Sequence, residues 1–180
     1  MLVSEKPSVT VGVPTYNRPE ELLETIRQIK EQTYQNLQVI ICDNGGSVTD
    51  DIIKNIEHDV RFEVIHNSEN IGLLKNTEKV FLLARGEYFC WFSDDDWHAS
   101  EYIETLLEVL KTNKNSKWAF TNFFERTHNG AVRGPFRNEL SKSLNYMASK
   151  SKFYRLLRFF LDDHANGQCN AFYGLFCTEM

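Results

Sequence analysis

Three adjacent carboxylates, Asp94, Asp95 and Asp96, directly follow a largely apolar, strand-like run at residues 87–92. Carboxylates this close together oppose one another's ionisation unless water, a metal ion or hydrogen-bond donors compensate their charge. Their hard oxygen atoms suit Mg2+ or Mn2+. The alternative is a solvated turn whose last carboxylate caps the next helix, because short acidic motifs often arise by chance. The surrounding elements must decide between these two interpretations.

Strand and helix patterns alternate along the chain, which predicts a parallel α/β sheet. Helices are expected to begin near Pro19 and near Ser100, with Ser100 as a cap, and Asn129-Gly130 marks a turn. The expected strands are residues 9–13, 37–42, 62–65, 87–92, 118–124 and 171–177. The expected helices are residues 19–29, 50–57, 73–81, 100–110 and 139–161.

The carboxyl ends of parallel strands share one edge of a sheet, and ligands bind in the crevice there. Three polar groups follow predicted strands: residues 14–18 after the first, Asp43 after the second, and residues 94–96 after the fourth. We therefore expect them to meet at one edge. The alternative is that each polar segment is an ordinary loop with no shared role. Because all three segments are predicted at the same edge, a binding site is the favoured interpretation.

The chemistry of this edge is narrowed by motifs that the sequence does not contain. It has no Gly-x-x-x-x-Gly-Lys and no Gly-x-Gly-x-x-Gly, so no glycine-rich loop is predicted to hold phosphates. A metal ion that bridges carboxylates and a diphosphate is the remaining route. Asp43, if ionised, only accepts hydrogen bonds and so favours a base with a ring N–H, such as uracil, thymine or guanine.

Four segments together carry a resemblance to a known family: VTVGVPTYNR, VIICDNGG, NIGLLKN and YFCWFSDDDW. From Val9 to about Leu110 the chain resembles the nucleotide-diphospho-sugar glycosyltransferases of family 2. This resemblance implies the GT-A fold, an open, mostly parallel, Rossmann-like sheet with helices on both faces. The family more often has Asp where this chain has Ser93.

The resemblance also implies roles for individual residues. Tyr16 would stack near the base or simply pack, and Asn17 would bind the nucleotide or cap the first helix. The metal, Mn2+ or Mg2+, would bind Asp95, with Asp96 as a second candidate or a loop cap. His98 is expected to be an ordinary loop residue. The implied nucleotide-binding residues are Pro14, Thr15, Tyr16, Asn17, Asp43, Lys75, Asn76 and Asp94.

The implied reaction is metal-dependent transfer of a sugar, with inversion, from a nucleotide-diphosphate donor to a hydroxyl acceptor. A UDP-type donor and a glycan or lipid-linked acceptor are expected. The family's catalytic base comes late in the chain, so we expect it beyond Met180; Asp162 and Asp163 are the candidates within the sequence. Two alternatives stay open: a donor-binding module without turnover, and a sugar nucleotidyltransferase.

Charge is unevenly distributed over a chain of 180 residues with a formal net charge of −5. Residues 1–125 carry 12 basic and 21 acidic side chains, whereas residues 126–158 carry 8 and 1. The acidic balance argues against nucleic-acid binding. Within the basic part, residues 152–161 form an amphipathic pattern that would either cover a core or contact an anionic membrane.

One structural domain is expected, with a donor-binding half at residues 1–125 and the start of an acceptor-side half at residues 126–180. No apolar run approaches the roughly 18 residues that span a bilayer, and the first residues lack the apolar core of a signal peptide. A cytoplasmic location, with contact to the inner face of the membrane as an option, is therefore predicted. Cys42 and Cys90 are expected to be buried, reduced thiols.

Overall fold

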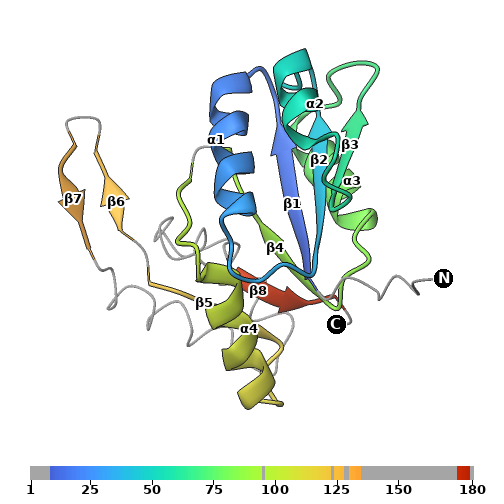
Figure 1. Cartoon of the computed structure of the whole chain (residues 1–180). Coiled ribbons are helices and arrows are strands. Elements are labelled where there is room, and N and C mark those ends of the chain that lie inside the picture. The colour runs from blue at the N-terminus through green and yellow to red at the C-terminus, as the bar shows by residue number, and fades with distance from the viewer. Residues whose placement is uncertain (1–8, 95, 123, 128–129, 135–173, 179–180) are drawn as a thin grey trace, which may run out of the picture. The chain divides into compact units, whose positions relative to one another are not determined.

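The computed structural model describes residues 9–94, 96–122, 124–127, 130–134 and 174–178 (Figure 1). The strands are β1 (Val9–Thr15), β2 (Leu37–Asp43), β3 (Phe62–His66), β4 (Tyr88–Trp91), β5 (Trp118–Phe120), β6 (Glu125–Arg126), β7 (Val132–Arg133) and β8 (Gly174–Cys177). The helices are α1 (Pro19–Lys30), α2 (Asp50–Ile56), α3 (Leu73–Leu82) and α4 (Tyr102–Thr112).

Six of the strands form one sheet in the order β3-β2-β1-β4-β8-β5. The pairs β1–β2, β1–β4 and β2–β3 are parallel, whereas β4 and β8 are antiparallel. The predicted fold class, a mostly parallel α/β sheet, is thereby confirmed. The antiparallel direction of β8 was not predicted, and the strand expected at residues 118–124 is shorter than expected.

The chain divides into two compact units, one formed by residues 1–119 and 175–180 and the other by residues 120–174. In the second unit, β6 and β7 form an antiparallel hairpin. Its turn contains Gly130, at φ 81°, and the amide of Thr127 donates to the carbonyl of Ala131 at 2.9 Å. The division predicted at residue 125 stays a prediction.

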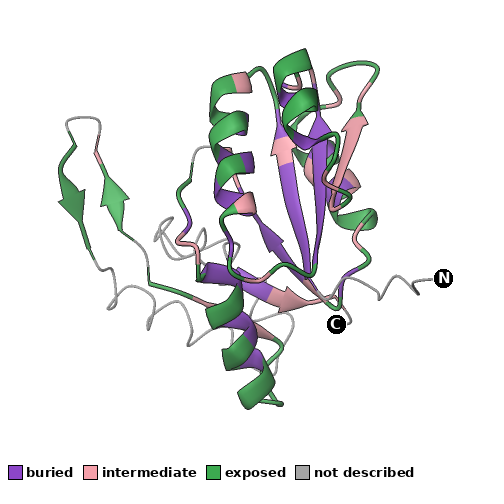
Figure 2. Cartoon of the chain, viewed as in Figure 1, coloured by how far each residue is buried: buried purple, intermediate pink, exposed green. Residues whose placement is uncertain are grey.

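Alternate residues of the strands pack against different helices, so the sheet has a core on each face (Figures 1 and 2). Val11 and Ile41 belong to one core, together with side chains of α1, α2 and α4. Ile40 and Cys42 belong to the other, with Val80 of α3. The predicted helices on both faces are therefore present, and each strand contributes to two cores because its side chains alternate.

Helix α1 begins where the sequence predicts, with Pro19 in its first turn and acidic residues beside it. The prediction that Asn17 caps this helix is wrong. Arg18 is the N-cap residue without a side-chain capping bond, and Asn17 itself has a positive φ of 53°. Ser100 likewise does not cap α4, which has Glu101 at that position.

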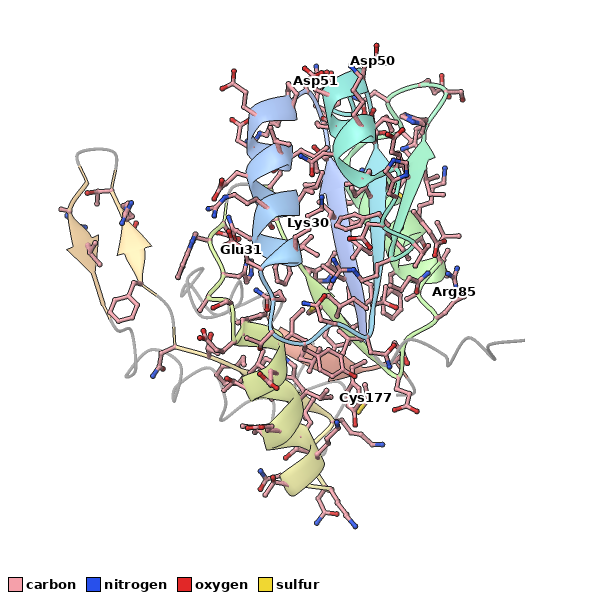
Figure 3. The ribbon with its side chains drawn as sticks, viewed as in Figure 1. Lys30, Glu31, Asp50, Asp51, Arg85 and Cys177 are labelled. Carbon is pink, nitrogen blue, oxygen red and sulfur yellow. The ribbon has the colours of Figure 1, made fainter. Side chains whose placement is uncertain are left out.

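Figure 3 shows where the two ends of the sheet lie. Asp50 and Asp51 mark the start of α2, near the carboxyl ends of β1, β2 and β3, whereas Arg85 lies toward the opposite end.

Helix α3 begins with two exposed apolar residues, Leu73 and Leu74, although the rest of the helix is amphipathic. None of the described helices is long and apolar enough to cross a membrane.

Gly12 permits the tight contact between β1 and the core on the α3 face. A Cβ atom at this position would lie 2.6 Å from a ring carbon of Phe89 and 2.6 Å from a methyl of Val80. Both neighbours are fully buried, so neither has room to move away. The glycine is therefore required for packing and not for a turn.

We predict that Gly12→Ala lowers the free energy of unfolding by about 1–3 kcal/mol, because an added methyl group must displace buried side chains. Urea unfolding followed by circular dichroism measures the change. Leu74→Ala, at a side chain that is 85% exposed, is the control and should change stability by less than about 0.5 kcal/mol. Equal stability of Gly12→Ala and the unmodified protein would contradict this description of the core.

Candidate functional site

The candidate site lies where β1 and β4 pair in parallel although β2 and β3 come between them in the chain. The chain builds outward from β1 in both directions, and ligands of open α/β sheets bind at such a switch point, beside the carboxyl ends of the strands. We refer to this edge, at the ends of β1 and β4, as the crevice. At this point the hydroxyl of Thr15 donates a 2.9 Å hydrogen bond to Oδ2 of Asp94. The structure thus brings together the first strand's end and the acidic run, 79 residues apart.

Arg18 approaches the same carboxylate from the start of α1. Its Nη1 lies 3.0 Å from Oδ1 of Asp94, so both oxygens of this carboxylate have a donor within the protein. The Asp94 side chain is 10% exposed and that of Arg18 is 46% exposed. The backbone amide of Arg18 also donates to Oγ of Ser47 at 3.2 Å. Arg18 lies in the predicted polar segment at residues 14–18 but was not predicted to be a site residue.

Asp43 ends β2 directly opposite Thr15 and is only 4% exposed. Its Oδ1 accepts hydrogen bonds from the backbone amides of Gly45 (3.1 Å) and Ser47 (3.0 Å), and its Oδ2 accepts one from Val48 (3.3 Å). One carboxylate therefore shapes the loop that leads from β2 to α2.

The electrostatics of Asp43 follow from these contacts. Burial alone would raise the pKa of this carboxyl group. The amides of Ser47, Gly45 and Val48 and the nearby His66 imidazole, 3.4 Å away, more than offset burial and hold the pKa below its usual range. Asp43 is therefore ionised at neutral pH and stabilises the fold in that form.

Tyr16 lies against the same loop. A Cβ atom on Gly45 would be 3.0 Å from the Tyr16 ring, so the absence of a side chain there lets the ring lie close to the backbone. The φ angles of Gly45 and Gly46, 150° and 78°, also favour glycine. Tyr16 is 49% exposed, and Pro14 lies within β1 opposite Cys42. The loops that follow β1 and β2 are thus in contact.

Asn76 is buried in α3, whereas its neighbour Lys75 is exposed. The Nδ2 of Asn76 donates to the carbonyl of Cys42 at 3.0 Å, and its Oδ1 accepts from Nδ2 of Asn67 at 2.8 Å. Asn67 also donates to Oδ1 of Asn44 at 3.0 Å. These amides connect α3 to the end of β2, and contact of Lys75 or Asn76 with a nucleotide stays a prediction.

Two buried glutamines, one within α1 and one just after it, hold the segment that follows the acidic run. Gln28 accepts from the amide of His98 at 2.8 Å and donates to the carbonyl of Asp96 at 3.4 Å. Gln32 donates to the carbonyl of Ala99 at 2.8 Å and accepts from the amide of Ile103 at 3.2 Å. The position of this segment is therefore set from the first helix.

His98 is buried, which sequence analysis did not predict. Its ring stacks on Phe92 with centroids 3.9 Å apart and meets Tyr102 edge to face at 4.8 Å. Burial lowers the pKa of His98 to about 4, so the imidazole is neutral at physiological pH. His98 thus acts as an aromatic core residue beneath the acidic run.

The described carboxylates suit a divalent cation by their chemistry, but they do not form a complete ligand set. Asp94 is engaged by Thr15 and Arg18, and Asp96 is exposed. Among the residues that the structure describes, no group of three His, Cys, Asp or Glu side chains is placed to hold a metal. Asp95 lies outside the described residues, as do Asp162, Asp163 and the amphipathic residues 152–161.

Some of the missed residues had a signal in the sequence. Gln28 falls near the apolar stripe of the helix predicted at residues 19–29, and Gln32 follows four residues later, just beyond its end. This spacing puts both on one side of the chain, where polar side chains next to apolar ones must find partners inside. Asn44 and Asn67 each follow a predicted strand, at the edge where ligands and loops gather. Arg18 is a cation between the first strand and its helix, within a segment already selected as polar.

Comparison with known proteins agrees with the fold. Residues 10–173 match the family model for glycosyl transferase family 2, so the chain belongs to this family. It is 28% identical over 164 residues to an uncharacterized glycosyltransferase of Methanocaldococcus jannaschii, covering 89% of this chain and 53% of that protein.

Two further proteins are similar over part of their length. One is the Escherichia coli UDP-Glc:alpha-D-GlcNAc-diphosphoundecaprenol beta-1,3-glucosyltransferase WfaP, 26% identical over 64% of this chain and 46% of that protein. The other is S. aureus TarS in complex with UDP-GlcNAc, with a TM-score of 0.66, 16% identity and coverage of 95% of this chain and 45% of that chain. The chain thus spans about half the length of the proteins it matches.

We predict that Asp43→Asn lowers the free energy of unfolding at pH 7 by about 1–3 kcal/mol, because an amide cannot accept all three backbone N–H bonds. The native pKa of Asp43 lies below its usual value of 3.8, so its stabilising effect is complete above that value and is lost as the pH falls through the native pKa. Urea unfolding from pH 7 down to pH 3 measures the difference between the two proteins.

The matched control for this series is Asp51→Asn, which changes an exposed carboxylate in the first turn of α2. It should alter stability by less than about 0.5 kcal/mol at every pH. A difference for Asp43→Asn that stays constant from pH 7 to pH 3 would show that the carboxylate charge has no part in holding the loop.

Proposed function

We propose that this chain is the donor-binding part of a glycosyltransferase that transfers a sugar from a nucleoside diphosphate to a hydroxyl acceptor. The observation that carries the proposal is the contact of Thr15 with Asp94 at the crevice between β1 and β4, with Asp43 on the neighbouring strand. Membership of glycosyl transferase family 2 supports it. Transfer with inversion is the proposed stereochemistry.

The arrangement of the loops suggests how a nucleoside would lie. Tyr16, half exposed above Gly45, offers an aromatic face to a base, and Asp43 lies on the strand beside it. Thr15 and Asp94 are near the ribose in this proposal. Lys75 is exposed at the start of α3, and we propose that it contacts the nucleotide near the base.

Asp43 has limited capacity for reading the base. A carboxylate offers about four lone-pair sites, and three backbone amides occupy three of them. The remaining acceptor site is on Oδ2, on the oxygen that faces His66 at 3.4 Å. We propose that the ring N–H of uracil, thymine or guanine binds there, so that one residue both folds the loop and selects the base.

A divalent cation, Mn2+ or Mg2+, is proposed at the acidic run, with Asp95 as its main ligand and Asp96 as a second. When bound, such a cation offsets the charge that develops on the departing diphosphate. The chain's own contribution is to hold the segment in place through Gln28 and to fix Asp94 through Thr15.

The donor and acceptor classes are also proposals. WfaP is named for UDP-Glc and a diphosphoundecaprenol-linked acceptor, and TarS was solved with UDP-GlcNAc. These names support a UDP-type donor and a glycan or lipid-linked acceptor for this chain. Asp162 and Asp163 are proposed as candidates for the catalytic base inside the sequence.

We predict that UDP binds together with a divalent cation and that its affinity falls at least about ten-fold when EDTA removes the cation. Without the cation, the diphosphate and the carboxylates of residues 94–96 repel each other. Titration calorimetry of UDP with Mn2+, with Mg2+ and with EDTA measures this. Asp96→Asn is expected to weaken the Mn2+-dependent part of the affinity, whereas Asp51→Asn, which changes an exposed carboxylate of α2, is not. UDP affinity that is equal with Mn2+ and with EDTA would contradict the proposed metal.

We predict that methylation of uracil at N3 weakens UDP binding by about 1–3 kcal/mol, because the ring N–H that Asp43 accepts is then missing. The comparison of UDP with N3-methyl-UDP changes only the ligand, so the folding role of Asp43 cannot disturb it. Methylation at the uracil C5 position is the control and should have a smaller effect. Equal affinity for UDP and N3-methyl-UDP would remove Asp43 as the base reader.

A further inference from the structure

Arg18 is fixed at the junction of three loops. Its backbone amide donates to Ser47 in the loop after β2, and its carbonyl accepts the amide of Leu22 in the first turn of α1 at 3.0 Å. Its guanidinium reaches Asp94 after β4. The backbone N–H and C=O of Arg18 are thus both hydrogen-bonded. Its side chain extends from the start of α1 to Asp94, which follows β4.

The charges around this crevice need a cation from the protein. Asp43, Asp94 and Asp96 all lie at the carboxyl ends of β2 and β4, and a nucleoside diphosphate would add further negative charge. Arg18 is in direct contact with one of these carboxylates and is 46% exposed, whereas Asp94 is 10% exposed. Of the two partners, the guanidinium is the more accessible to a ligand.

A guanidinium has five N–H donors in a planar fork, so it can contact more than one anionic group at a time. Phosphate groups favour bidentate contacts with a guanidinium. In the proposed donor site the nucleoside lies near Tyr16 and Asp43 and the cation lies at the acidic run, so the diphosphate is placed between them. Arg18 contacts Asp94 at the start of that run, which puts its side chain beside the proposed position of the diphosphate.

We propose that Arg18 binds the diphosphate of the nucleotide donor, with Asp94 holding its guanidinium in position. This inference rests on the proposed donor site and adds to it a binding residue at the entrance of α1. Asp94 acts here as a positioning residue. Its ion pair with Arg18 restricts the long side chain before the ligand arrives, which lowers the entropy lost on binding.

Arg27 offers a matched control within the same helix. It also makes ion pairs, with Glu24 at 2.5 Å and Glu31 at 2.6 Å, and its side chain is 54% exposed. Its partners lie along α1 and not at the carboxyl end of β4. Replacing Arg27 removes the same charge and the same type of ion pair without touching the crevice.

The test compares three ligands that differ only in their number of phosphate groups: uridine, UMP and UDP. Each is titrated calorimetrically at one fixed concentration of Mn2+. The proteins are the unmodified chain, Arg18→Gln, Arg18→Lys and Arg27→Gln. For Arg18→Gln we expect UDP to bind about ten-fold more weakly and uridine to change less than about two-fold, because a charged hydrogen bond is lost only with phosphate. Arg18→Lys should be intermediate, and Arg27→Gln unchanged.

The series guanosine, GMP and GDP is measured in parallel, so that the test of Arg18 does not depend on which base the protein prefers. If the unmodified chain binds neither UDP nor GDP, the proposed function itself fails. If it binds one of them and Arg18→Gln binds it equally well or more tightly, the inference about Arg18 fails alone. An equal loss for the nucleoside and its diphosphate would also overturn it, because that result means a purely structural ion pair.

Discussion

The parallel pairing of β1 with both β2 and β4 is the constraint on which the rest of the site depends. It makes the chain build in opposite directions from one central strand, so the ends of β1 and β4 form the switch point at which ligands of open α/β sheets bind. Thr15 and Asp94 join the two sides of this crevice by a hydrogen bond. Gly12 lets β1 lie close enough to Phe89 for the pairing to coexist with a dense core.

The loops at this edge are shaped by polar side chains that accept backbone amides. Asp43 collects the amides that leave β2, Gln32 binds the entrance of α4, and Asn44 accepts the amide of Ile71 ahead of α3. Each of these bonds satisfies a donor that would otherwise be buried without a partner. The same residues that give the edge its polar character therefore also define its shape, which is why folding and binding are hard to separate in Asp43.

Much of this fold could be predicted from the sequence, because alternation of apolar runs and helical stripes directly encodes the parallel sheet. The meeting of Thr15 with Asp94 followed from the same pattern. The burial of His98 could not be predicted, since it depends on Phe92 and Tyr102 closing around it. Asn17 was expected to cap α1, but it has a positive φ and Arg18 occupies the N-cap position instead. Local sequence carries no information on such long-range contacts.

The amides that join Asn44, Asn67 and Asn76 carry no net charge, unlike the ion pair of Arg18 with Asp94. Screening by dissolved ions weakens attraction between exposed charges but hardly affects hydrogen bonds between neutral, enclosed groups. The crevice thus combines an amide frame that is insensitive to ionic strength with an ion pair that responds to it. A rise in salt concentration would loosen the guanidinium while the loops on either side keep their positions.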